Sequence, residues 1–187
     1  MNKFDKENNI KVRRSDRSVT DSKWIINFLE NAPYATIATS DKDQPVININ
    51  TFVYDRQTDA IYFHTAKRGK FRSNIEKNSR ICFSVASMGR LLPADVAREF
   101  SVEYSSVVLY GNIEIMTDME LARDKMQLLL DKYFPRFKPE EHYRSITSAE
   151  VQEISVFKIS IDKWSAKQKE APNDFKDAFY FDNRYNI

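Results

Sequence analysis

Short segments in which apolar and polar residues alternate dominate the chain, and this pattern predicts β-strands. Turn-forming residues separate the first of these segments at spacings typical of hairpins. Strands are expected at 34–39, 45–55, 60–64, 80–86, 104–116 and 151–161. Six strands with few helices between them favour an antiparallel sheet closed into a barrel, with flanking helices, over a parallel α/β sheet.

Apolar residues recur at helical spacing in other segments. The spacing predicts a helix over 21–31, which Pro33 ends, and a shorter helix over 67–78. The longest expected helix spans 118–134 and ends before Pro135.

Three segments fit neither pattern. Residues 1–19 are polar and basic and should form an extended lead-in. The irregular connection at 87–103 exceeds the ~12–15 residues usual for structureless loops, so a short helix is expected near 93–99. The polar tail 167–187 should pack on the barrel or cross to a partner subunit, because burying its aromatic rings would stabilise it. Those rings belong to Phe175, Phe179, Tyr180, Phe181 and Tyr185.

Composition is typical of one globular domain over 1–187, with 42% hydrophobic and 30% charged residues. One cysteine and two histidines are too few for a zinc finger or an iron–sulfur site, so no metal is expected. The three glycines stand alone, which excludes the glycine-rich nucleotide-binding motifs.

A net charge of +2 argues against a dedicated nucleic-acid binder. No apolar run approaches the ~18 residues of a membrane helix and the N-terminus lacks a signal-peptide pattern, so we expect no membrane partner and a cytoplasmic location.

Two amides share one face of the segment 45–55. Alternation places Asn48 and Asn50 on one side and Ile47 and Ile49 on the other. Amides both donate and accept hydrogen bonds, which suits the edge of a planar heterocycle such as a flavin pyrimidine ring. A solvent-facing strand surface explains the same spacing and is the more common explanation.

Basic residues gather between 66 and 80, where a strand ends and a helix is predicted to begin. The Thr65 hydroxyl, with Lys67, Lys70 and the N–H groups of a helix N-terminus, offers a phosphate site without a glycine-rich loop. A solvated basic helix is the alternative. His64 precedes this segment and, by itself, is more often an ordinary strand-end histidine than a catalytic group.

The ordered segments YATIATSDKDQPVININTFVYD, IYFHTAKRGKFRSNIEKNSRICFSV and YSSVVLYGNIEIM resemble the pyridoxamine 5'-phosphate oxidase-related flavoproteins. They are most similar to the nitroimidazole-resistance (Nim-type) branch. The resemblance covers 12–164, and its most specific part is 62–78. It implies a split β-barrel that binds FMN and forms a homodimer with the flavins at the subunit interface.

The resemblance also implies a set of flavin-binding residues. Segment 45–51 would lie along the isoalloxazine ring, and the basic segment would bind the phosphate. His64 matches a histidine beside the flavin and is the one candidate catalytic residue. The implied contacts are Asn48, Ile49, Asn50, Thr51, His64, Thr65, Lys67, Lys70 and Ser106.

One departure from the family's sequence pattern argues against one of the family's enzyme activities. Nothing after Trp164 resembles the Arg-Leu-His-Asp-Arg-like substrate segment of pyridoxamine-phosphate oxidases proper, so oxidation of vitamin B6 is disfavoured. The leading hypothesis is an FMN-dependent oxidoreductase that passes electrons to a small planar acceptor such as a nitroaromatic compound. The alternatives are a flavin-binding or storage protein without catalysis, and a haem-binding split barrel with His64 as the plausible axial ligand.

Overall fold

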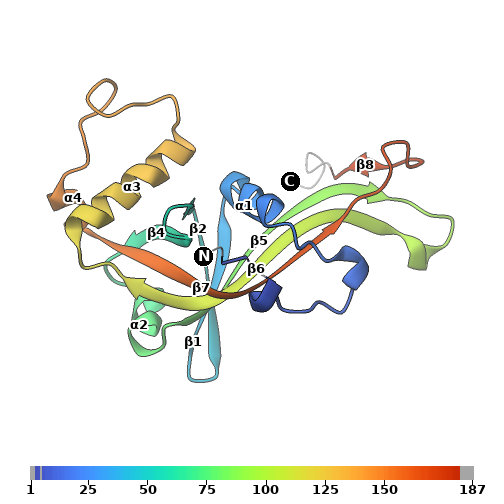
Figure 1. Ribbon diagram of the computed structural model, residues 1–187, viewed down its shortest axis with the longest axis horizontal. Coiled ribbons are helices and arrows are strands. Elements are labelled where there is room, and N and C mark those ends of the chain that lie inside the picture. Colours follow the sequence, from blue (N-terminus) through green and yellow to red (C-terminus); the bar gives the residue numbers. More distant parts are fainter. Residues whose placement is uncertain (1–2, 5, 182–187) are drawn as a thin grey trace.

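An antiparallel sheet forms the centre of the computed structural model, which describes residues 3–4 and 6–181 (Figure 1). The sheet has eight strands in the order β2-β1-β5-β6-β7-β4-β3, and β8 pairs with β5. The strands are β1 (Ala35–Asp41), β2 (Gln44–Asn50), β3 (Val53–Asp55), β4 (Ala60–Ala66), β5 (Arg80–Leu92), β6 (Ser101–Ile115), β7 (Ile154–Lys169) and β8 (Phe179–Tyr180). The predicted antiparallel barrel with flanking helices is confirmed, with more strands than the six expected.

Helices flank the sheet. The α-helices are α1 (Ser22–Asn31), α2 (Lys70–Lys77), α3 (Met119–Tyr133) and α4 (Ser148–Gln152), and the short 3₁₀ turns are η1 (Lys6–Asn8), η2 (Ser15–Arg17) and η3 (Ala97–Glu99). Helix α1 begins where the Asp21 side chain accepts a hydrogen bond from the Lys23 N–H. Its apolar stripe, Ile25 and Leu29, is fully buried against the sheet. None of the described helices is long and apolar enough to cross a membrane.

Two sequence predictions for the strands were wrong in detail. The segment 45–55 is not one strand, because the chain breaks at Thr51 and the buried Phe52. The segment 87–103 is not an irregular connection, since β5 and β6 extend through it and leave only η3 near the predicted helix. The hairpin is long because backbone pairing between β5 and β6 continues to Leu92 and Ser101, although the alternating burial of β5 ends near Val85.

The last long strand also begins later than predicted, after α4. A capping box fixes that helix: the Thr147 hydroxyl accepts from the Glu150 N–H, and the Glu150 carboxylate accepts from the Thr147 N–H. The strand β7 then continues to Lys169, so the tail begins three residues after the predicted boundary at 167.

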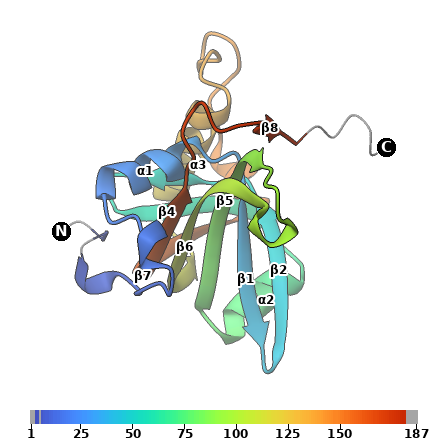
Figure 2. The same cartoon turned by 90° about the vertical axis from the view of Figure 1, so that its right-hand side faces the viewer.

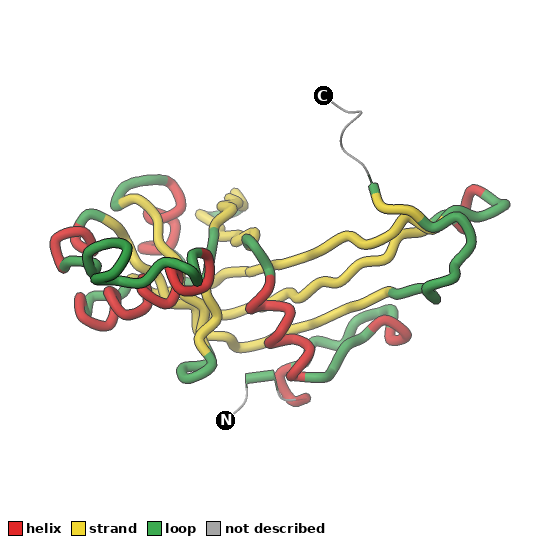
Figure 3. Tube along the Cα trace, turned by 90° about the horizontal axis from the view of Figure 1, so that it is seen from above, coloured by secondary structure: helices red, strands yellow, loops and turns green. Residues whose placement is uncertain are grey.

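Three strands extend beyond the barrel as a long ribbon (Figure 3). On one side β1 pairs with β5 only at Cys82–Ser84, and on the other β4 pairs with β7 only at 154–160. We call residues 85–92, 101–110 and 161–169 the ribbon. The lead-in lies along the β7 edge of the ribbon, where the Val19 N–H donates to the Ala166 carbonyl at 3.0 Å.

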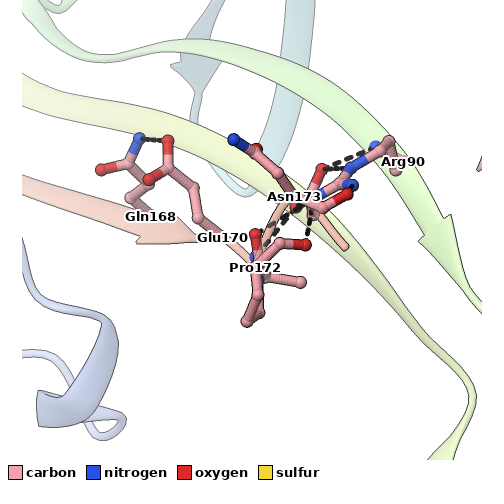
Figure 4. A network of polar contacts seen from close by, with 7 residues as sticks. Arg90, Gln168, Glu170, Pro172 and Asn173 are labelled. Atoms are coloured by element: carbon pink, nitrogen blue, oxygen red, sulfur yellow. Dashed lines mark hydrogen bonds and ion pairs between the residues drawn. The ribbon is translucent and has the colours of Figure 1, made fainter. Parts of the chain in front are cut away.

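The C-terminal tail returns to the ribbon through an ion pair between neighbouring strands (Figure 4). Arg90 and Glu103 approach to 2.7 Å. The Arg90 guanidinium also donates to the carbonyls of residues 171–173, and Glu103 accepts from the Ala171 N–H at 2.8 Å. Hydrogen bonds from Arg90 and the Ala171 N–H lower the pKa of Glu103 to about 2, so the pair stays ionised at neutral pH.

The tail packs on the sheet, but it does not bury its aromatic rings. Strand β8 pairs with Arg90 and Leu91 at the outer end of β5. Phe179 and Tyr180 keep 53% and 71% of their surface exposed, and Phe175 and Phe181 are also exposed. Burial of these rings within the chain was therefore a wrong expectation, and Tyr185 lies outside the described residues.

A buried ion pair joins α3 to the last residue of β3. The Lys125 ammonium lies 2.8 Å from Asp55, and both residues are at least nine-tenths buried. Asp55 also accepts from the Gln57 N–H and the Thr58 hydroxyl. Burial alone would raise the pKa of Asp55, but the hydrogen bonds from Lys125, Gln57 and Thr58 outweigh it and hold that pKa below its ordinary value.

Candidate functional site

Strand β2 turns its apolar side chains outwards. Ile47 and Ile49 have 64% and 65% of their surface exposed. Asn48 and Asn50 are half-buried, because their cross-strand partners on β1 belong to the buried core. Asn50 donates to the His64 carbonyl at 2.8 Å, which ties the end of β2 to β4. The two amides therefore do not form a solvent-facing surface, and the side of β2 left open is apolar.

Helix α2 lies beside the β1–β2 hairpin (Figure 2), and two ion pairs hold it there. Lys70 at its first turn and Lys77 at its last turn each lie 2.9 Å from the same Asp41 oxygen. The hydrogen bonds from Lys77 and Lys70 lower the pKa of Asp41 to about 2. Lys70 is thus positioned at the N-terminus of α2, and it is already paired with a carboxylate.

The approach to α2 is exposed and cationic. Lys67 and Arg68 are exposed, and within residues 3–4 and 6–181 neither makes a hydrogen bond or ion pair. The Thr65 hydroxyl is half-buried and donates to the Ala66 carbonyl at 3.0 Å. Gly69, the N-cap, leaves open space around its α-carbon. The predicted phosphate residues therefore surround a helix N-terminus whose first N–H groups have no intrahelical acceptors.

His64 lines a cavity of about 350 Å³ beneath α3 and α4. Its Nδ1 atom is buried and has no hydrogen-bond partner among the residues that the structure describes. Burial lowers the pKa of His64, so the imidazole is neutral at neutral pH and free to accept, donate or ligate. The cavity is otherwise largely apolar, with walls from Met126, Leu129, Leu130, Ile146, Val151 and Ile154.

The predicted site residues do not all come together within one chain. Asn50, His64 and Thr65 lie at the facing ends of β2 and β4, and Thr51 is exposed at the break after β2. Ser106 instead lies in the ribbon, opposite Lys167 on β7, whereas His64 lies opposite Val156. Those partners are eleven residues apart, about 35 Å along a strand.

The sequence did not predict the contacts that α3 makes with the break after β2. The Lys132 ammonium on α3 donates to the carbonyls of Ala32 and Phe52 at 2.9 Å each and lies 3.9 Å from the centre of the Phe52 ring. The neighbouring Tyr133 hydroxyl accepts from the Phe52 N–H at 3.1 Å. Burial lowers the pKa of Lys132 to about 8. Lysine is common near the C-terminal end of a helix, so the sequence does not indicate that Lys132 contacts these carbonyl groups. The contacts depend on the fold, which brings residues distant in sequence next to the lysine.

Comparison with solved structures finds the same fold in several proteins of low sequence identity. The flavocytochrome Anf3 from Azotobacter vinelandii superposes with a TM-score of 0.74 at 20% identity, over 99% of this chain and 81% of its own. The FAD and heme binding protein from Mycobacterium smegmatis gives 0.74 at 22% identity, over 83% and 74%. A protein described as a 5-nitroimidazole antibiotic resistance protein from Bacteroides thetaiotaomicron gives 0.67 at 19% identity, over 82% and 90%.

These similarities show the fold, and the sequence itself shows the family. No curated protein matches the chain. The sequence profile described as pyridoxamine 5'-phosphate oxidase matches residues 21–168, which include every strand from β1 to β6 and most of β7. The resemblance inferred from the ordered segments is confirmed, and the chain belongs to the pyridoxamine 5'-phosphate oxidase family.

Proposed function

We propose that the protein binds FMN and passes electrons from the reduced flavin to a small planar acceptor such as a nitroaromatic compound. One observation carries the proposal: the segment from His64 to Lys70 runs alongside the β1–β2 hairpin and contacts it at Asn50, the end of β2, and at Asp41, the end of β1. At one end Asn50 contacts His64, and at the other Lys70 contacts Asp41, beside the β1–β2 turn. Asn50 and the cationic N-terminus of α2 thus lie at the two ends of this segment, and we call β2, the segment and the first turn of α2 the β2–α2 surface.

The β2–α2 surface carries both kinds of group that FMN binding requires: donors for the phosphate and an apolar surface for the ring system. The N–H groups of α2, the Thr65 hydroxyl and the ammonium groups of Lys67 and Lys70 are donors suited to a phosphate. Exposed Ile47 and Ile49 offer an apolar surface to a ring system. The bound flavin would supply the electron transfer, while these side chains bind and orient it. The neutral imidazole of His64, with its free Nδ1, is the group placed to exchange a proton or hydrogen bond with a ligand.

A homodimer accounts for the position of Ser106. The distance along β7 prevents one flavin from touching Ser106 and His64 of the same chain. A flavin between two chains could receive Ser106 from one subunit and the β2–α2 surface from the other. The exposed isoleucines of β2 and the exposed aromatic rings of the C-terminal tail are the apolar surface that such an interface would cover.

Replacing Lys70 with alanine should weaken FMN binding by about 1.5–3 kcal/mol, roughly 10- to 150-fold, the contribution of a hydrogen bond to a charged group. Titration of flavin fluorescence measures this affinity. Lys77→Ala is the matched control, because it removes the other ion pair to Asp41 at the opposite end of α2. Riboflavin, which lacks the phosphate, should bind all three proteins alike. Equal losses of FMN affinity in both variants would mean that Lys70 acts only through Asp41.

Turnover decides between an enzyme and a flavin-binding protein without catalysis. The purified holoprotein should oxidise a reduced nicotinamide cofactor with nitroaromatic or quinone acceptors, and His64→Ala should lower the rate while retaining the flavin. A protein that holds FMN but reduces no acceptor would support a binding or storage role instead.

Haem binding is the second candidate, and the cavity beside His64 favours it. An unpartnered imidazole nitrogen at an apolar wall is suited to an axial haem ligand. Added haemin should then produce a bound Soret spectrum in the wild-type protein that His64→Ala abolishes and free imidazole restores. His142→Ala is the control, because that histidine lies on an exposed loop and accepts from the Lys138 N–H. An unchanged spectrum in His64→Ala would exclude His64 as the ligand.

A further inference from the structure

Two side chains at the end of α3 bind both backbone groups of Phe52, which lies in the break between β2 and β3. The Phe52 N–H donates to the Tyr133 hydroxyl at 3.1 Å, and the Phe52 carbonyl accepts from the Lys132 ammonium at 2.9 Å. Phe52 is fully buried. In a continuous strand these backbone groups would bond to a neighbouring strand. The side chains of α3 therefore take the place of strand pairing at this residue.

The break exposes an edge of β4 to the end of β2. Strand β3 pairs with β4 only over Val53–Asp55, and continuing this register by two residues would set Thr51 opposite His64. Instead, β4 at His64 has no strand partner on that side among the described strands. The Asn50 amide donates to the His64 carbonyl there, at 2.8 Å. The break thus sets the end of β2 beside β4 without joining the two into a ladder.

The same two side chains also hold the end of α1. The Lys132 ammonium donates to the carbonyls of Ala32 and Leu29 at 2.9 and 3.4 Å, and the Tyr133 hydroxyl donates to the Pro33 carbonyl at 2.8 Å. Carbonyls at the C-terminal end of a helix lack intrahelical donors and favour a nearby cation. Lys132 and Tyr133 thus join α3, the end of α1 and the break after β2, and we call this arrangement the α3 clamp.

We infer that Lys132 and Tyr133 are positioning residues of the proposed flavin site, because they specify the break that sets Asn50 and Thr51 beside the end of β4. The inference rests on the proposed function, in which Asn50 and Thr51 contact the flavin. The α3 clamp acts through the backbone of Phe52 and has no contact of its own with the flavin. Its loss should therefore weaken binding of the flavin ring along β2 and leave phosphate binding at α2 unchanged.

The strength of the α3 clamp depends on the charge of Lys132. Burial lowers the pKa of Lys132 to about 8, although the Glu30 carboxylate opposes that shift. The ionisable groups that face the ammonium are Glu30 on α1, which Arg56 holds, and Tyr133 on α3, while the break contributes carbonyl oxygens and the Phe52 ring. A neutral amine binds carbonyls more weakly than an ammonium. Flavin affinity should therefore fall as the pH rises through about 8.

Flavin titration of Tyr133→Phe tests the α3 clamp. The change removes one hydroxyl and should weaken FMN and riboflavin binding by the same factor, about tenfold, because buried backbone groups lose their partner. Tyr54→Phe is the matched control: it removes another buried hydroxyl, which donates to Asp59 at 2.6 Å, and should leave both affinities unchanged. Unchanged affinities in Tyr133→Phe, or a loss confined to FMN, would overturn the inference.

The pH profile separates positioning from a purely structural role. The affinity of the wild-type protein for riboflavin should fall between about pH 7 and 9, and the profile of Lys132→Met should be flat. The free energy of unfolding should move the other way, because the folded pKa is below its ordinary value and the unfolded chain binds more protons above pH 8. A wild-type affinity that stays constant or rises with pH would overturn the inference, whether or not Lys132→Met folds.

Amide hydrogen exchange at Phe52 tests the α3 clamp without a flavin. The Phe52 N–H should exchange about tenfold faster in Tyr133→Phe than in Tyr54→Phe, because only the first change removes its acceptor. Equal exchange in the two variants would overturn the inference even if flavin binds. If the exchange responds as expected but the wild-type protein binds neither FMN nor riboflavin, the proposed function itself fails, and the positioning role is overturned with it.

Discussion

Replacing Lys125 with methionine should lower the free energy of unfolding by about 3–5 kcal/mol, because it leaves the buried Asp55 carboxylate without its cation. Methionine retains the approximate length of the lysine side chain, so the loss reports charge more than packing. Chemical denaturation at neutral pH measures the effect.

The double variant Lys125→Met/Asp55→Asn is the control, and it should recover part of the loss because no unpaired charge remains. The pKa of Asp55 is lower in the folded protein than its ordinary value, so its stabilising contribution is complete at neutral pH and is lost as pH falls through the folded pKa. The difference between Lys125→Met and wild type should therefore shrink in acid. A difference that is independent of pH, together with no recovery in the double variant, would assign the loss to packing.

Gly111→Ala should be the most damaging small substitution in the sheet. A β-carbon at position 111 would lie 2.0 Å from the Ser160 carbonyl oxygen, a backbone atom of the neighbouring strand. The strands β6 and β7 change register at this bulge, so neither can move away without breaking ladder hydrogen bonds. We expect a loss of about 3 kcal/mol, at the upper end of the range for overpacking, measured as a shift in the denaturation midpoint.

Ser105→Ala on the same strand provides the comparison for Gly111→Ala. Ser105 pairs with neighbours on both sides and its side chain makes no hydrogen bond among the described residues, so the change should stay within about 0.5 kcal/mol. Similar stabilities for Gly111→Ala and Ser105→Ala would mean that β7 can yield at the bulge.

Alternation and helix-ending prolines were sufficient to predict most elements. The helix at 118–134 and the strands at 60–64 and 104–116 match α3, β4 and β6 closely, because each has a continuous apolar face that is buried in the fold. The ends of the long strands were predicted poorly. Beyond the barrel, β5 and β7 face solvent on more sides, so their apolar pattern weakens while the backbone pairing continues.

The candidate site was only partly accessible to sequence reasoning. The order of segments placed His64, Thr65 and Lys70 in one region, and in the structure these residues follow one another from the end of β4 to the first turn of α2. The outward orientation of Ile47 and Ile49 could not be foreseen, because alternation defines two faces without saying which is buried. The ion pair between Lys70 and Asp41 joins residues distant in sequence, and so does the separation of Ser106 from His64.

The strand order of the sheet also dictates when this site can exist during synthesis. Among the described strands, β4, which carries His64, pairs with β3 and β7, and β7 is synthesised long after β4 because it lies far along the sequence. A nascent chain that has already produced His64, Lys67 and Lys70 must therefore wait for Ile154–Lys169 before β4 has its main partner. Pairings this distant in sequence form slowly, on the order of milliseconds to seconds. Any ligand that binds the β2–α2 surface must therefore bind after β7 has been synthesised.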